Sequence, residues 1–148
     1  MTCDVNVVDW RLFEASLTTL RFEVFVEEQG VPVELELDED DPMATHVAAW
    51  STEGAIVGTG RILDSGKIGR MAVRSAFRGR GIGGALLDRL VNEGRRLNLS
   101  RVYLGAQLSA VGFYRRYGFS PFGKVFPDAG IDHQMMELFL SEQKKYHE

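Results

Sequence analysis

Residues 78–84 read Arg-Gly-Arg-Gly-Ile-Gly-Gly, and the sequence on either side makes this stretch decisive for the fold. The preceding residues 68–73, Ile-Gly-Arg-Met-Ala-Val, are typical of a strand, and the apolar spacing after residue 84 is typical of a helix. Glycines allow a tight turn in which several backbone N–H groups point at one spot, and a helix N-terminus adds about half a positive charge behind them. The stretch therefore predicts a strand-turn-helix unit that binds an anion, and a pyrophosphate suits it best.

Two other nucleotide-binding motifs fit this stretch less well. Gly79, Gly81 and Gly84 match the G-x-G-x-x-G fingerprint of dinucleotide-binding folds, which needs a carboxylate about 20 residues later. Residues 94–127 contain no Asp or Glu, so this interpretation is disfavoured. A Walker loop would need Gly-Lys-Ser/Thr after the turn, and none follows. The plainer alternative is a glycine-rich turn with solvated arginines.

A second motif follows about 30 residues later, and it favours a binding role for the glycine loop over a turn with solvated arginines. The pattern Arg78-x-x-Gly81-x-Gly83, followed by Ala110-x-x-Phe113-Tyr114-x-x-x-Gly118-Phe119, resembles the GNAT superfamily of N-acetyltransferases in order and spacing. Residues 21–29 and 128–136 are similar to its ElaA-like branch. The resemblance covers most of the chain. It implies an α/β (α+β) fold with a mixed, largely antiparallel central sheet flanked by helices, and acetyl-coenzyme A as cosubstrate.

The resemblance also implies roles for individual residues. The glycine loop would hold the pyrophosphate, Tyr114 would lie beside the thioester sulfur, and a bulge in the strand would supply a backbone N–H for the oxyanion. The expected cofactor-binding residues are Met71, Ala72, Val73, Arg78, Gly79, Arg80, Gly81, Ile82, Gly83, Gly84, Gln107, Phe113 and Tyr114. Two positions depart from the family pattern. Gln107 replaces a frequent Asn, and Arg70 stands where many members carry a catalytic Glu, so the general base is open.

Acetyl transfer to an amine needs an acid for the departing thiolate and a base for the amine. Tyr114, with an ordinary pKa of about 10, is the expected general acid; its alternative role is an aromatic side chain packed on the core. His133, Glu28 and His46 are the candidate bases. His133 is preferred because it lies where the chain is expected to enter the last strand near the site, and because imidazole titrates near neutral pH. A structural role for His133 is the alternative. Glu28 and Gln29 are expected to bind the amine substrate.

Composition fits an enzyme of this kind. The chain has 148 residues and 45% hydrophobic content, which predicts one domain over residues 1–148. Cys3 is the sole cysteine and the three histidines are scattered, so we expect neither disulfides nor a metal. No apolar run approaches the length of a membrane span and the N-terminus lacks a secretion signal, so a cytoplasmic protein, a monomer or homodimer without membrane partners, is expected.

The net charge of −4 hides a strong segregation. Residues 1–65 carry three basic and fourteen acidic side chains, whereas residues 66–127 carry twelve basic and two acidic ones. The basic segment coincides with the two cofactor motifs. Six carboxylates between positions 34 and 41 would either attract a cationic amine or form a solvated loop; they are Glu34, Glu36, Asp38, Glu39, Asp40 and Asp41.

Periodicity predicts the order β-α-β-β-β-α-β-α-β-β. Strands are expected at residues 4–8, 45–51, 55–63, 68–73, 102–104, 119–125 and 134–140, and helices at 9–29, from about 85, and at 109–117. Asp9 is a suitable N-cap and Gly118 a suitable helix stop.

The function predicted from the sequence is direct acetyl transfer from acetyl-coenzyme A to a primary amine of a small molecule. Transfer to a protein amine, transfer of another acyl group, and a non-catalytic acyl-coenzyme A sensor stay open as alternatives. A nucleic-acid module is disfavoured because the arginines form no basic stripe and the rest of the chain is acidic.

Overall fold

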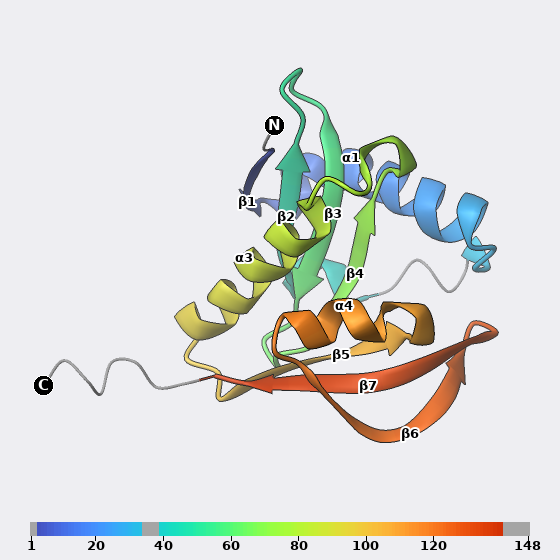
Figure 1. The fold of residues 1–148 in the computed structure, drawn as a ribbon. Coiled ribbons are helices and arrows are strands. Elements are labelled where there is room, and N and C mark those ends of the chain that lie inside the picture. The colour runs from blue at the N-terminus through green and yellow to red at the C-terminus, as the bar shows by residue number, and fades with distance from the viewer. Residues whose placement is uncertain (1–2, 34–38, 141–148) are drawn as a thin grey trace, which may run out of the picture.

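The strands form two antiparallel sheets that diverge from each other (Figure 1), as the computed structural model of residues 3–33 and 39–140 describes them. The first sheet has the order β1-β2-β3-β4, from strands Asp4–Val8, Thr45–Trp50, Ile56–Ile62 and Ile68–Val73. The second has the order β5-β7-β6, from strands Arg101–Gln107, Ile131–Phe139 and Ser120–Asp128. A parallel bridge between Lys67 and Tyr103 links the two. The expected mixed, largely antiparallel architecture is confirmed.

The helices occur in the predicted order. Helix α1 (Trp10–Arg21) begins at Asp9, whose side chain accepts a 2.9 Å hydrogen bond from the backbone N–H of Arg11. It continues as a π-helical segment, η1 (Phe22–Glu28), so the expected helix over 9–29 is present but widens in its last third. Helix α3 spans Ile82–Arg96 and α4 spans Val111–Arg116, ending before Gly118 with φ +93°. None of the helices described is long and apolar enough to span a bilayer.

The two faces of the first sheet are covered by different helices, α3 in front and α1 behind in Figure 1. Strand β2 shows why: Val47 and Ala49 pack in the cluster under α3, while Ala48 between them packs in the cluster under α1. This alternation is the two-residue period of a strand buried on both faces.

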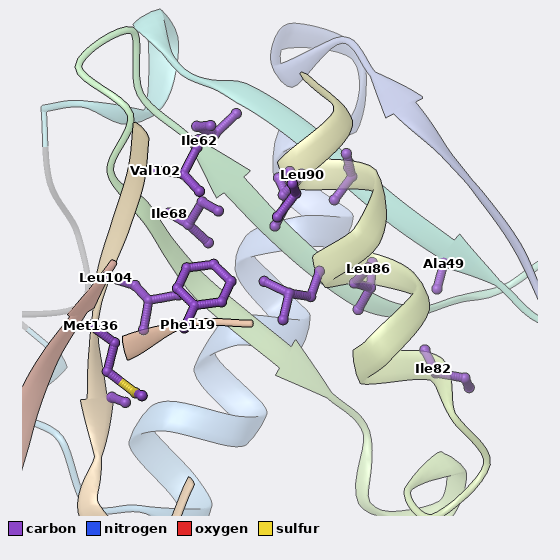
Figure 2. Close-up of a cluster of buried hydrophobic side chains, with 14 of the residues drawn as sticks. Ala49, Ile62, Ile68, Ile82, Leu86, Leu90, Val102, Leu104, Phe119 and Met136 are labelled. Atoms are coloured by element: carbon purple, nitrogen blue, oxygen red, sulfur yellow. The ribbon is translucent and has the colours of Figure 1, made fainter. Parts of the chain in front are cut away.

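The cluster under α3 also joins the two sheets. Leu86 and Leu90 on α3 are fully buried over the first sheet, and Ile62 and Ile68 from that sheet lie beside Val102 from the second (Figure 2). Burying each such side chain contributes about 1.5–3 kcal/mol. The sheets therefore share one core even though their strands diverge.

Candidate active site

The predicted anion cradle forms the connection between β4 and α3. A short turn, η3 (Ser75–Phe77), leads into Gly79 and Gly81, which have φ values of +79° and +82°. Gly81 is the N-cap of α3, and no side chain in the described part of the chain caps that helix. The N–H groups of its first turn are thus offered to an external acceptor at the positive end of the helix. Arg80 lies over the Phe77 ring, 5.1 Å from its centroid.

The last two glycines of the cradle make room for α4. A Cβ built on Gly84 would lie 1.8 Å from the hydroxyl oxygen of Tyr117, and one on Gly83 would lie 3.7 Å from the Phe113 ring. Helix α4 therefore packs directly on the first turn of α3. Ile82, the first residue of α3, is buried, so its side chain belongs to the core and only its backbone faces the cradle.

The cradle stands beside the split between β4 and β5. At the closed end of the split, the backbone N–H of Tyr103 donates to the carbonyl of Gly66 over 3.0 Å. Beyond this point the two strands belong to different sheets, and β4 ends at Val73 and β5 at Gln107. Figure 1 shows β4 and β5 diverging. A split of this kind leaves backbone groups of both strands available to an extended ligand.

The bulge expected in β4 is present. Thr59 pairs with Ala72 and Arg61 with Gly69, so Arg70 and Met71 together face the single residue Gly60. Arg70 adopts a left-handed conformation with φ +53°, unusual for a residue with a side chain. The bulge begins one residue before the expected stretch of residues 71–73. Ala72 is buried toward α1, so its side chain faces away from α3.

Tyr114 points from α4 across the split toward this bulge. Its hydroxyl lies 3.8 Å from Met71 Sδ, and its ring packs against Phe113 and Phe119 with centroid distances of 5.0 and 5.9 Å. Burial raises the pKa of Tyr114 to about 12. The phenol therefore stays protonated at any physiological pH, so it can donate a proton or a hydrogen bond but cannot act as a base.

The end of η1 contacts both sides of the split. The Glu28 carboxylate accepts two 2.9 Å hydrogen bonds from the Arg78 guanidinium, and Arg78 Nε also donates to the carbonyl of Val73 over 2.8 Å. Gln107, at the end of β5, donates from its amide to the Gln29 side chain over 3.0 Å. Two expected substrate-binding residues thus pair with two expected cofactor-binding residues. Sequence reasoning missed these pairings because 50 and 78 positions separate the partners.

His133 lies on β7 directly opposite Gln107 in the strand register. Its Nδ1 is 2.7 Å from the carbonyl oxygen of Ile131, and its ring stacks on Phe126 at 5.8 Å. Because a carbonyl only accepts, Nδ1 carries the proton, and in the neutral ring Nε2 is the acceptor. The structure brings His133 to the end of β5 where Gln29 and Gln107 meet.

His46 does not belong to this site, and its expectation as a base is wrong. The ring is 2% exposed on the α1 side of the first sheet, stacked on Trp10, and its Nε2 lies 2.8 Å from the backbone oxygen of Asp41. Burial lowers the pKa of His46, partly offset by Asp41. His46 is therefore a buried structural residue.

The six carboxylates at positions 34–41 do not form one solvated group. Asp41 is 4% exposed and binds Arg21 at 2.9 Å and Arg61 at 2.6 Å. Burial raises the pKa of Asp41, but the two arginines outweigh it and the net pKa is lowered. Asp41 is therefore neither a solvated loop residue nor part of a field for the amine. Glu34, Glu36 and Asp38 lie outside the described residues. Within the described ranges, no three His, Cys, Asp or Glu side chains gather as metal ligands.

Comparisons with known proteins agree with this geometry. The family model described as acetyltransferase (GNAT) domain matches residues 13–140. The uncharacterized N-acetyltransferase YjcF of Bacillus subtilis is 38% identical over 122 residues, covering 80% of this chain and 87% of that protein. Protein ElaA of Escherichia coli is 34% identical over 127 residues, covering 80% and 82%.

Solved structures show the same likeness. An acyl-CoA N-acyltransferase from Pseudomonas aeruginosa superposes with a TM-score of 0.83 at 35% identity, over 93% of this chain and 99% of that one. The crystal structure of Escherichia coli ElaA gives a TM-score of 0.83 at 29% identity with the same coverage. The resemblance drawn from the two motifs is confirmed, and so is the ElaA-like branch inferred from residues 21–29 and 128–136.

Proposed function

The chain belongs to the GNAT family of acetyltransferases, and we propose that it transfers an acetyl group from acetyl-coenzyme A directly to a primary amine of a small molecule. The observation that carries the proposal is the split itself. It has an uncapped, glycine-rich helix N-terminus on one side and the protonated hydroxyl of Tyr114 reaching into it from the other. Acetyl-coenzyme A would supply a pyrophosphate for the first feature and a thioester for the second.

The glycine loop is proposed to bind the pyrophosphate chiefly through backbone N–H groups. Gly79 and Gly81 hold left-handed conformations that orient successive N–H groups to one side, and a Cβ at either would meet no atom within 4 Å. The open space at both positions is what a bound phosphate would need. Arg80, exposed beside the loop, adds a full positive charge. Arg78 contributes less directly, because Glu28 and Val73 already engage its guanidinium.

Tyr114 is proposed to assist departure of the thiolate. Its pKa of about 12 lies well above the ordinary thiol value of about 8.5, so complete proton transfer to the sulfur would be uphill. Donation of a hydrogen bond in the poorly solvated split is the role its environment favours, since such bonds strengthen as charge develops on the acceptor. The general-acid role expected from the sequence is thereby narrowed to hydrogen-bond donation. The backbone N–H groups around the bulge at Met71 are proposed to face the oxyanion.

The amine is proposed to approach where Gln29, Gln107 and His133 meet. An alkyl ammonium with a pKa of about 10.4 must lose a proton before it attacks, and His133 Nε2 has an available lone pair in the neutral ring. Glu28 is a poor alternative because both carboxylate oxygens accept hydrogen bonds from Arg78. His133 therefore stays the proposed base.

Release of free thiol from acetyl-coenzyme A tests the proposal directly. Purified protein would be incubated with a panel of small primary amines, and we expect thiol release that requires both an amine and the protein. Acetyl, propionyl and longer acyl donors should be compared, because the Pseudomonas aeruginosa structure is described more broadly as an acyl-CoA N-acyltransferase. Coenzyme A binding without turnover for any small amine or peptide would instead favour the sensor alternative.

A further inference from the structure

Segment η1 is a π-helix that ends at both edges of the split. The backbone N–H of Gln29 donates to the carbonyl of Val24, five residues earlier, over 3.2 Å. The last residue of η1, Glu28, pairs with Arg78 after β4, and the following residue, Gln29, pairs with Gln107 at the end of β5. π-helical turns are rare and occur often at functional sites. A seven-residue π-helix whose end contacts both diverging strands therefore calls for a functional explanation.

Arg78 is the centre of this arrangement. Its Nε donates to the carbonyl of Val73, and its two terminal nitrogens donate to the two oxygens of Glu28, all at 2.8–2.9 Å. A planar guanidinium bound on two sides is fixed in both position and orientation. Gly79, the next residue, opens the left-handed turn of the cradle with φ +79°. Fixing Arg78 thus fixes the point at which the glycine loop begins.

We propose that Glu28 is a positioning residue which, through Arg78, holds the glycine loop in the conformation that binds the coenzyme A pyrophosphate. The inference rests on the proposed function of that loop. Glycines leave a released loop many backbone conformations, and a ligand that must order the loop binds more weakly. The Glu28–Arg78 pair lowers that cost by ordering the loop beforehand. It also ties the cofactor loop to the helix that borders the amine side.

The opposite role for the same contact predicts the opposite change in coenzyme A affinity. A carboxylate bound to Arg78 also resembles an anion that occupies the place of a phosphate. If Glu28 competed with the pyrophosphate, its removal would strengthen coenzyme A binding. The third hydrogen bond of Arg78, to Val73, favours the positioning role, because it makes the guanidinium a link between the end of β4 and η1.

The same helix provides a matched control. Glu23 on η1 lies 3.7 Å from Arg74, which also belongs to the connection between β4 and α3. This pair has a similar partial exposure but a longer contact than the Glu28–Arg78 pair, and Arg74 lies four residues before Arg78. Glu23→Ala removes the same charge from the same helix without releasing the glycine loop.

Coenzyme A titration by calorimetry on the full-length protein tests the proposal. Glu28→Ala and Arg78→Ala should each weaken binding about fivefold, and the double variant should be no weaker than the weaker single, because each single change breaks the same link. Glu23→Ala should stay within about twofold of wild type. In turnover assays Glu28→Ala should raise the KM for acetyl-coenzyme A with kcat within about twofold. Glu28→Gln, which keeps the side-chain shape, serves if the alanine variant does not fold.

Four results would overturn the inference. Tighter binding by Glu28→Ala would make Glu28 a competitor of the pyrophosphate. Unchanged binding, or losses that multiply in the double variant, would mean that the two residues act independently. Each of these results rejects the positioning role alone, provided that the wild-type protein binds coenzyme A. If the wild-type protein does not bind coenzyme A, the proposed function is rejected and the inference with it.

Discussion

Tyr114→Phe separates catalysis from folding because, among residues 3–33 and 39–140, the hydroxyl has only one weak partner. That partner is Met71 Sδ at 3.8 Å, and a thioether sulfur is a poor acceptor. Removing the hydroxyl leaves no strong acceptor unpaired, and the ring contacts with Phe113 and Phe119 are retained. The free energy of unfolding should therefore change by less than about 1 kcal/mol. If the hydroxyl stabilises the departing thiolate, kcat should fall about 10²-fold, equivalent to about 2.7 kcal/mol of transition-state stabilisation.

Thiol release at saturating acetyl-coenzyme A, combined with calorimetric coenzyme A titration, measures the two effects separately. Tyr103→Phe is the matched control, since it deletes the same group at the closed end of the split, where the hydroxyl meets Ser65 at 3.3 Å. The control should keep wild-type kcat. With a Tyr114 pKa of about 12, wild-type activity should show no tyrosine ionisation below about pH 10. The reasoning is refuted if Tyr114→Phe keeps wild-type kcat with chemistry rate-limiting, or if an activity loss near pH 10 disappears in that variant.

The remaining predictions concern the cradle and the buried cluster behind the first sheet. Gly81→Asp should weaken coenzyme A binding at least tenfold more than Gly81→Asn, because both residues strain the same left-handed position and only Asp adds a negative charge where the phosphate lies; equal affinities in calorimetry would move the phosphate elsewhere. Asp41→Ala should lower the free energy of unfolding by about 3–5 kcal/mol in urea titrations, because Arg21 keeps a buried charge without its partner, whereas Asp40→Ala, 60% exposed, should cost less than about 1 kcal/mol. The lowered pKa of His46 means that the unfolded chain binds its proton first, so stability should fall as pH drops below about 6.5, and His46→Gln should lose that part of the pH dependence.

Local patterns predicted the scaffold well. The alternation over residues 45–51 and 55–63, with Gly54 in the turn, gave the β2-β3 hairpin, and Gly54 indeed has φ +86°. Asp9 caps α1 and Gly118 follows α4 because capping and left-handed turns depend on residues a few positions apart. The end of β5 was missed by three residues, since the apolar pattern stops at Leu104 whereas pairing with β7 continues to Gln107.

Long-range partners explain what the sequence did not reveal. The run at positions 34–41 resembles a solvated acidic loop, yet Asp41 is buried by two arginines, Arg21 and Arg61, each 20 residues away. A run of charges carries no sign that one member will meet such partners in the core. Neutralising Asp41 together with its acidic neighbours would therefore damage the fold before it tested an amine site.

The π-helix was hidden for a related reason. Phe13, Leu17, Leu20 and Val24 recur at spacings that fit an ordinary α-helix, and three of them are fully buried against the first sheet as expected. The widened turn begins only at Phe22. Its residues carry no local signal for that geometry, and the partners of Glu28 and Gln29 at its end are 50 and 78 positions away.

The position of the site follows from how the two sheets are joined. The bulge at Arg70 and Met71 interrupts the pairing of β4 with β3, and beyond the bridge at Tyr103 β4 has no ladder with β5. Such a gap would weaken an ordinary sheet, but the shared core under α3 holds both halves together from one side. On the other side, the end of η1 contacts both halves through polar pairs that water and ligands can reach. The apolar core under α3 therefore fixes the width of the split. The polar contacts at the end of η1 are where a ligand can change the structure. For this reason we expect cofactor affinity to respond more to Glu28 than to any single residue of the core beneath it.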